Sequence, residues 1–245
     1  MNKPSAVILA GGLGTRLRSA VDDRNKVAAS VNGRPFISYL LDRLDSSGFQ
    51  EVIICSGHKG DDLLERMGNC YKRLKLTYSK EPTALGTAGA LRFAEHLISS
   101  EEALILNGDS YCDIELDKLI DYHRAKKNAA TLVAVWVPDT GRYGAVKIDN
   151  GEKIIAFSEK RGVGHPGYVN AGIYIIKKAF FGSIPEGRPV SLEREIFPQW
   201  ISQGLAVFRH NGGFIDIGTP ESYAEAQSYL TELGEDAMAG QVNTK

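Results

Sequence analysis

The chain has 245 residues, of which 43% are hydrophobic and 24% charged, a composition typical of globular proteins. This length can bury the core of one large α/β domain or of two small ones. The formal net charge of -1 argues against a broad surface for nucleic acid or membrane, and no apolar run approaches the roughly 18 residues of a transmembrane helix.

The cysteines and histidines argue against several classes of enzyme. The three cysteines are widely spaced and form no C-x-x-C pair, so we expect neither a zinc site nor a disulfide framework. H-x-x-x-H spacing and a G-x-S-x-G elbow are both absent from the sequence, which weakens metallohydrolase and serine-hydrolase interpretations. The first apolar run begins close to the N-terminus, and we therefore expect no signal peptide and a cytoplasmic location.

A glycine-rich loop follows the first predicted strand, an apolar run that begins at residue 6. The loop contains Gly11, Gly12 and Gly14 and continues into Thr15 and Arg16. Glycines allow backbone N–H groups to approach an anion, and hydroxyl and guanidinium groups donate hydrogen bonds to phosphate oxygens. We therefore expect a nucleoside polyphosphate to bind here. The alternative is a tight turn that serves folding alone.

Two better-known glycine motifs do not fit this loop. A Walker-type P-loop needs Gly-Lys-Ser or Gly-Lys-Thr after its first glycine, and neither follows here. The dinucleotide fingerprint G-x-G-x-x-G begins correctly at Gly12 and Gly14, but Leu17 occupies its third glycine position. The loop therefore belongs to neither class.

The first half of the chain alternates between predicted strands and helices. After the first strand, strands are expected at 52–55, 74–78 and 103–106. The helices between them run from Pro35 to Gly48, over 61–67, and from a Thr87 cap to about Leu97. This alternation predicts a Rossmann-like, mostly parallel central sheet with right-handed crossovers.

The second half of the chain predicts a smaller mixed sheet region that is partly antiparallel. A helix over 116–127 leads to strands at 131–137, 145–148, 154–157 and 168–176, with a hairpin turn at Asn150-Gly151. Ser191 is expected to cap a helix to about Gln203 that Pro198 kinks or splits. Strands at 206–209 and 214–217 are expected to pair with each other, and a final helix to end near Leu230.

Two acidic residues occupy positions that favour ligand binding. Asp109 follows the strand at 103–106 directly, where parallel α/β sheets place their ligands. The alternative for Asp109 is a helix cap or a solvated turn. Asp216 is flanked by Ile215 and Ile217, and a carboxylate there is costly to bury unless it is paired or binds a metal.

The chain resembles the sugar-1-phosphate nucleotidyltransferases over residues 6–230. The resemblance is carried by these blocks: Gly11-Gly12-Leu13-Gly14-Thr15-Arg16-Leu17, Lys26, Leu85-Gly86-Thr87-Ala88-Gly89-Ala90, Asn107-Gly108-Asp109, Phe157-Ser158-Glu159-Lys160, Asn170-Ala171-Gly172-Ile173-Tyr174 and Asp216-Ile217-Gly218-Thr219-Pro220. It implies that a phosphate oxygen of a sugar 1-phosphate attacks the α-phosphorus of a nucleoside triphosphate and expels pyrophosphate. Asn25 and Ala84 replace prolines that are usual in the family, which affects no charged group.

The resemblance assigns roles to individual residues. Asp109 and Asp216 would bind Mg²⁺, which prefers carboxylate oxygens. Arg16, Lys26 and Asp109 form the expected catalytic set, because Arg16 would hold the outer phosphates and Lys26 would neutralise the reacting ones. The expected nucleotide-binding residues are Leu9, Gly11, Gly12, Gly14, Thr15, Arg16, Glu81, Gly86, Thr87 and Asp109. On the sugar side, Glu159 would bind sugar hydroxyls, Lys160 the sugar phosphate, and Gly144 and Asn170 would line the pocket.

The sequence has no internal repeat and no linker long enough to separate independent domains. We therefore expect one nucleotidyltransferase domain over residues 1–232, with a nucleotide-binding half at 1–128 and a sugar-binding half at 129–232. Residues 233–245 are expected to form a loose tail. The expected partners are a nucleoside triphosphate and a sugar 1-phosphate, without nucleic acid or membrane, and a homodimer is left open.

The sequence also indicates which nucleoside triphosphate and which sugar 1-phosphate the enzyme is expected to use. Guanine presents adjacent N–H donors, which a carboxylate can accept together, so Glu81 favours GTP over UTP or dTTP. The alternative for Glu81 is a solvated loop acid. Within the guanylyl enzymes, the blocks around Gly144, Asn170 and Asp216 look most like those that use D-glycero-α-D-manno-heptose 1-phosphate. The alternatives are guanylyl transfer to mannose 1-phosphate, uridylyl or thymidylyl transfer to glucose 1-phosphate, and a non-catalytic regulatory subunit.

Overall fold

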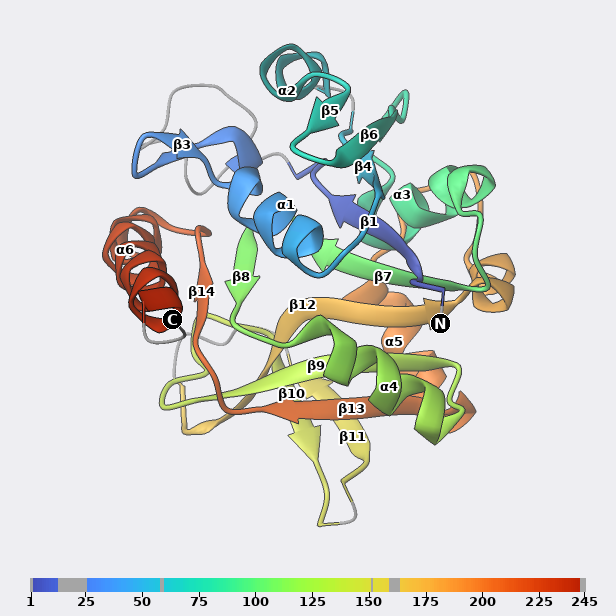
Figure 1. The fold of residues 1–245 in the computed structure, drawn as a ribbon. Coiled ribbons are helices and arrows are strands. Elements are labelled where there is room, and N and C mark those ends of the chain that lie inside the picture. Colours follow the sequence, from blue (N-terminus) through green and yellow to red (C-terminus); the bar gives the residue numbers. More distant parts are fainter. Residues whose placement is uncertain (1, 13–25, 58–59, 151, 159–163, 243–245) are drawn as a thin grey trace.

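The computed structural model describes residues 2–12, 26–57, 60–150, 152–158 and 164–242. Within these residues, a ten-stranded sheet forms the centre of the molecule, in the order β11-β10-β12-β7-β1-β4-β6-β5, with β9 pairing with both β12 and β13 (Figure 1). Its parallel part consists of β1 (Ser5–Leu9), β4 (Glu51–Cys55), β6 (Leu74–Ser79) and β7 (Glu102–Asn107). The parallel strands predicted from the short apolar runs are therefore confirmed, and a short edge strand, β5 (Cys70–Tyr71), follows β6 in the sheet.

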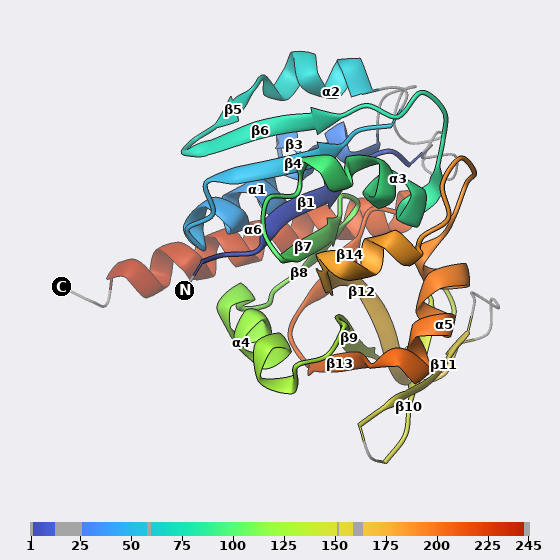
Figure 2. The same cartoon turned by 90° about the vertical axis from the view of Figure 1, so that its right-hand side faces the viewer.

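The rest of the sheet is mixed, as the sequence predicts. The long strand β12 (Gly167–Lys177) runs antiparallel to β7, to β9 (Ala130–Val137) and to β10 (Ala145–Ile148). Two further strands, β11 (Ile154–Ser158) and β13 (Leu205–His210), pair with β10 and β9. Strands β5 and β6 lie at one end of the molecule and β10 and β11 at the opposite end (Figures 1 and 2).

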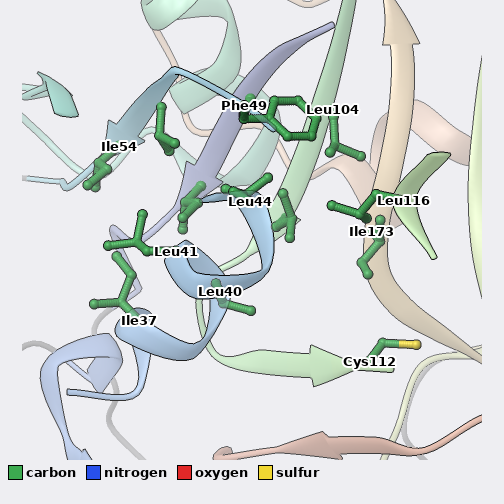
Figure 3. Packing of buried hydrophobic residues seen from close by; sticks show 14 of the residues in the cluster. Ile37, Leu40, Leu41, Leu44, Phe49, Ile54, Leu104, Cys112, Leu116 and Ile173 are labelled. Carbon is green, nitrogen blue, oxygen red and sulfur yellow. The ribbon is translucent and has the colours of Figure 1, made fainter. Parts of the chain in front are cut away.

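One face of the sheet is covered by α1 (Ile37–Ser46) and α4 (Leu116–Lys126), and α2 (Gly60–Met67) adds Leu63 to the same core. The apolar residues of α1 recur at helical spacing, and Ile37, Leu40, Leu41 and Leu44 belong to one buried cluster that includes strand residues such as Ile54, Leu104 and Ile173 (Figure 3). Each fully buried leucine contributes about 2 kcal/mol of hydrophobic stabilisation. This packing fixes α1 on the sheet. It thereby also fixes the ends of the loops that lie beside α1.

The opposite face is covered by α3 (Gly86–Ala94) and by the segment that follows β12. This segment includes α5 (Phe197–Trp200), and its buried aromatic residues are Phe181, Phe197 and Trp200. Side chains alternate along β1, so Val7 faces this layer while Ala6 and Ile8 face the other. The sheet is therefore buried on both faces between two helical layers.

A third core lies beside the sheet, under α6 (Pro220–Val242). There α6 packs on β14 (Phe214–Asp216), which pairs with β8 (Ser110–Cys112), and near the small hairpin of β2 (Ser30–Val31) and β3 (Arg34–Pro35). None of the described helices is both long enough and apolar enough to cross a membrane.

The structure overturns two local predictions and confirms a third. The expected pairing of the strands at 206–209 and 214–217 is wrong, because β13 pairs with β9 and β14 with β8. The end of the last helix near Leu230 is also wrong, since α6 continues to Val242 through the residues expected to be a loose tail. The predicted split at Pro198 is confirmed. There a π-helical turn, Leu192–Ile196, is capped by Ser191 and gives way to α5.

Candidate functional site

The site begins where the parallel strands end, because the carboxyl ends of β1, β4, β6 and β7 lie at the same edge of the sheet. Gly11, after β1, and Gly57, after β4, touch at this edge, where a Cβ on Gly11 would lie 3.2 Å from the Gly57 Cα. The carbonyl of Leu9 accepts a hydrogen bond from the Gly108 N–H after β7. The glycines allow three loop backbones to meet without intervening side chains.

Lys26 and Asp109 form an ion pair at this edge. The Lys26 Nζ lies 2.6 Å from the Asp109 Oδ2, and the lysine side chain is 10% exposed while the aspartate side chain is 42% exposed. Lys26 belongs to a 3₁₀ turn, Lys26–Ala28, and Asp109 follows β7. The pair places a cation and a carboxylate side by side, with the carboxylate open to a ligand.

Strand pairing brings Asp216 next to the segment that carries Asp109. Asp216 of β14 is opposite Ser110 of β8, and the Ile217 N–H donates to the Asp109 carbonyl at 2.9 Å. The Asp216 Oδ1 is buried and lacks a hydrogen-bond partner among the described residues. Because an unpaired buried carboxylate oxygen is costly, this atom is suited to a cation.

A pocket of about 960 Å³ is lined by residues from the end of β7, from β12 and from the start of α3, among others. The predicted site residues that line it are Gly86, Thr87, Asp109, Gly144, Asn170 and Asp216. The structure therefore brings together residues expected to contact the nucleotide, the metal and the sugar. Their sequence numbers span both halves of the chain, which supports a site shared by two substrates.

Glu81 lies next to Gly11 rather than at the pocket lining. Its side chain is 5% exposed, and its Oε2 accepts a hydrogen bond from the Leu85 N–H at 2.9 Å. Its Oε1 would lie 2.9 Å from a Cβ placed on Gly11. Glu81 is thus a buried carboxylate held beside the glycine loop and not the solvated loop acid that was the alternative.

The start of α3 differs from the expected Thr87 cap. Helix α3 begins at Gly86 and its N-cap residue is Leu85, while the Val190 carbonyl accepts from the Ala88 and Gly89 N–H groups. Gly86 has a φ of +73°, and a Cβ on it would lie 2.5 Å from the Val190 oxygen. The predicted cap is therefore wrong, and the Thr87 hydroxyl is directed to Glu193 instead, at 2.9 Å.

The expected sugar side is built on β12 and the loop before β10. The Gly144 carbonyl accepts from the Asn170 N–H at 3.0 Å, and space next to the Gly144 Cα is open. Tyr143 beside it packs edge-on against Phe214, with ring centroids 5.4 Å apart. Burial raises the pKa of Tyr143. This wall is therefore partly aromatic.

Several lining residues were not predicted. Asn107, Ser110 and Glu193 all line the pocket, and Tyr174 lies buried behind it. Asn107 could have been found, since it belongs to the same block as Asp109. The sequence around Glu193 does not indicate a binding role, because Glu193 lies in a helical turn and its contact, Thr87, is 106 positions away in the sequence.

Five predicted site residues, Gly14, Thr15, Arg16, Glu159 and Lys160, lie outside the described residues. Gly12 is described and has open space next to its Cα. In the described part of the chain, three or more His, Cys, Asp or Glu side chains nowhere gather into a metal-binding cluster. Asp109 and Asp216 could hold a metal as two carboxylate ligands, with further ligands from substrate and water, as is usual for Mg²⁺.

Comparisons with known proteins agree with this geometry. A family model described as Nucleotidyl transferase matches residues 5–232. The D-glycero-alpha-D-manno-heptose 1-phosphate guanylyltransferase of Aneurinibacillus thermoaerophilus is 34% identical over 226 residues, which cover 92% of this chain and 97% of that protein. The mannose-1-phosphate guanylyltransferase of Mycobacterium tuberculosis is 31% identical over 229 residues, which cover 92% of this chain and 64% of that protein. The crystal structure of HddC from Yersinia pseudotuberculosis complexed with GMP-PN has a TM-score of 0.84 and 31% identity, and the match covers 93% of this chain and 100% of HddC. The predicted fold class is confirmed.

Proposed function

Because this chain belongs to the nucleotidyl transferase family, we propose that it transfers the guanylyl group of GTP to D-glycero-α-D-manno-heptose 1-phosphate. A phosphate oxygen of the sugar 1-phosphate forms a bond to the α-phosphorus of GTP. The bond from that phosphorus to the oxygen of the β-phosphate breaks, and pyrophosphate leaves with the electron pair. The products are a GDP-sugar and pyrophosphate.

The observation that carries this proposal is the Lys26–Asp109 pair beside Asp216 at the edge of the pocket. Two anionic substrates must approach each other, so charge neutralisation and positioning dominate catalysis. The Lys26 ammonium, fixed by Asp109, supplies positive charge at the point where the phosphates would meet. A non-catalytic regulatory subunit would have no need of this charged set.

A divalent cation fits the two carboxylates. Asp109 and Asp216 would hold Mg²⁺, since both offer oxygen ligands and the Asp216 Oδ1 is buried without a partner among the described residues. When bound, the ion would neutralise phosphate charge and orient the triphosphate.

Glu81 is the residue that we expect to read the base. Guanine presents N–H donors on N1 and on its exocyclic amine, and a carboxylate accepts both. The buried position of Glu81 beside Gly11 supports this role, because a charge-assisted hydrogen bond is stronger away from water. HddC, a relative with the same fold, was solved with GMP-PN.

The identity of the sugar 1-phosphate is the most specific part of the proposal. The heptose 1-phosphate guanylyltransferase matches over almost its full length, which favours heptose 1-phosphate. The similarity to the mannose-1-phosphate guanylyltransferase makes mannose 1-phosphate the second candidate. Gly144 and Asn170 line the expected sugar wall, and Glu159, Lys160 and Arg16 keep their roles as predictions.

The proposal is tested by pyrophosphate release from GTP and a sugar 1-phosphate in the presence of Mg²⁺. Asp109→Ala should reduce turnover by about 100-fold or more, because the reacting phosphates lose a fixed electrostatic contact. Asp113→Ala is the matched control, since Asp113 lies four positions away and pairs with Arg43 at the surface. Equal turnover in both variants would contradict the proposed site.

A further inference from the structure

A tyrosine hydroxyl lies buried behind the pocket and joins its two walls. Tyr174 of β12 is completely buried, and its hydroxyl lies 2.8 Å from the Asn170 Nδ2 and 3.4 Å from the Glu193 Oε1. Asn170 and Glu193 both line the pocket, whereas Tyr174 does not. The hydroxyl therefore contacts the ligand-facing residues from behind.

The direction of each hydrogen bond follows from donor and acceptor chemistry. The Asn170 Oδ1 accepts from the Gly172 N–H at 2.9 Å, so the amide nitrogen is the end that faces Tyr174. This nitrogen can only donate, and the tyrosine oxygen accepts. The single phenolic proton is then directed to the Glu193 Oε1, which accepts the hydrogen bond. Burial, the dominant effect, raises the pKa of Tyr174 well above its usual value, so the phenol keeps its proton.

This directed chain ends at the opposite wall of the pocket. The other carboxylate oxygen of Glu193, Oε2, accepts from the Thr87 hydroxyl at 2.9 Å and from the Ser191 hydroxyl at 2.8 Å. Thr87 belongs to α3, on the side expected to hold the nucleotide, and Asn170 belongs to β12, on the side expected to hold the sugar. The tyrosine hydroxyl thus contacts Asn170 directly and reaches Thr87 only through the other oxygen of Glu193, which the Thr87 and Ser191 hydroxyls hold independently.

We propose that Tyr174 is a positioning residue, whose hydroxyl fixes the Asn170 amide and the Glu193 carboxylate and so sets the donor and acceptor pattern that reads the sugar hydroxyls. This inference rests on the proposed function, because it needs a sugar 1-phosphate as the ligand. One N–H of the Asn170 amide donates to Tyr174. With the amide fixed in this way, its other N–H is the one that donates a hydrogen bond to a sugar hydroxyl. Sites built from oriented hydrogen bonds discriminate strongly between related ligands.

The test compares Tyr174→Phe with Tyr122→Phe. Both substitutions remove one phenolic hydroxyl, and that of Tyr122 donates to the Val207 carbonyl at 2.8 Å, in a contact between α4 and β13. In Tyr174→Phe, the KM for heptose 1-phosphate should rise by about 10-fold or more, and the preference for heptose over mannose 1-phosphate should fall by a similar factor. The KM for GTP should stay within about 2-fold of the control.

Equal sugar KM values and equal preferences in the two variants would overturn the inference while leaving the proposed function intact. Wild-type protein that turns over no sugar 1-phosphate would refute the proposed function, and the inference with it. If Tyr174→Phe fails to fold, Glu193→Gln removes the charged acceptor and retains the tyrosine ring. Glu193→Gln should raise the sugar KM in the same way, and an unchanged KM would overturn the inference.

Discussion

The Lys26 Nζ lies 2.6 Å from the Asp109 Oδ2, although the two residues are 83 positions apart in the sequence. The aspartate is fixed by the end of β7, and the lysine by the turn that follows the glycine loop. An ion pair with one exposed partner adds about 1 kcal/mol or less to stability. The pair is therefore better explained by the charge that it places at the substrate phosphates.

Lys26→Met should lower kcat by about 100-fold or more with little change in thermal stability, because a positive charge at the reacting phosphates is lost. Lys26→Arg should not restore full activity, since a planar guanidinium cannot replace a compact ammonium at this distance. Steady-state kinetics and thermal melts measure both effects. Wild-type turnover in Lys26→Met would remove lysine from the catalytic set.

Asp216→Asn should abolish stabilisation of the protein by Mg²⁺ and GTP together. In wild type the ligands bind only the folded state and raise the melting temperature. Without ligands the variant should be at least as stable as wild type, because the substitution alters a position whose buried Oδ1 lacks a partner among the described residues. Thermal melts test this, with Asp113→Asn as the control. A normal Mg²⁺-dependent shift in Asp216→Asn would contradict the metal site.

Gly172→Ala should destabilise the fold far more than Gly33→Ala. Both glycines have positive φ, +72° and +78°, so both variants incur a backbone cost of about 1 kcal/mol. A Cβ on Gly172 would also lie 2.8 Å from atoms of Asn107 and Ser110, whereas the space at Gly33 is open. Denaturant unfolding should show a further loss of about 2 kcal/mol or more in Gly172→Ala. Equal losses would show that β12 can shift at this point.

His123 should make stability fall in mild acid. Its side chain is 1% exposed, and its Nδ1 lies 2.7 Å from the Thr131 hydroxyl. Burial lowers the pKa of His123 below 6.5, with the Glu102 carboxylate opposing the shift. The unfolded chain therefore binds the proton more readily, so stability is full above about pH 6.5 and declines below it.

The contribution of His123 between about pH 7.5 and pH 5.5 is at most about 1.4 kcal/mol. His123→Gln should reduce the pH dependence of the free energy of unfolding by that amount, as measured by denaturant unfolding at the two pH values. A pH dependence in His123→Gln identical to that of wild type would show that His123 does not couple folding to protonation.

The parallel part of the fold could be predicted because its strands are short apolar runs that end in glycine or polar residues. The meeting of Asp109 and Asp216 could not be predicted in the same way. Asn211-Gly212-Gly213 is typical of a hairpin turn, but β13 gains a long parallel partner in β9, and β14 pairs with β8 instead. Long-range pairing thus overrode a local turn signal, and that pairing builds the two-carboxylate site.

The polar network behind the pocket shows a second limit of the sequence. Glu193 contacts Thr87 and Tyr174, which are far from it in the chain, whereas the neighbouring sequence predicts only a helix capped by Ser191. Residues with a strong local context, such as Asp109 after a strand, could be selected from the sequence. Residues whose role depends on a hydroxyl far away in the sequence could be identified only from the structure.

Guanine recognition by Glu81 in a guanylyl transfer is tested most directly by a competition assay. Heptose 1-phosphate, Mg²⁺ and equal amounts of GTP, UTP, dTTP and ATP are mixed with the protein, and mass spectrometry identifies the nucleotide sugar. Wild type should form GDP-heptose with one pyrophosphate per product. Glu81→Gln should lower the ratio of GDP-sugar to UDP-sugar by about 10-fold or more, because the paired acceptor is lost. UDP-sugar or dTDP-sugar as the main wild-type product, or an unchanged ratio in the variant, would contradict guanine recognition by Glu81.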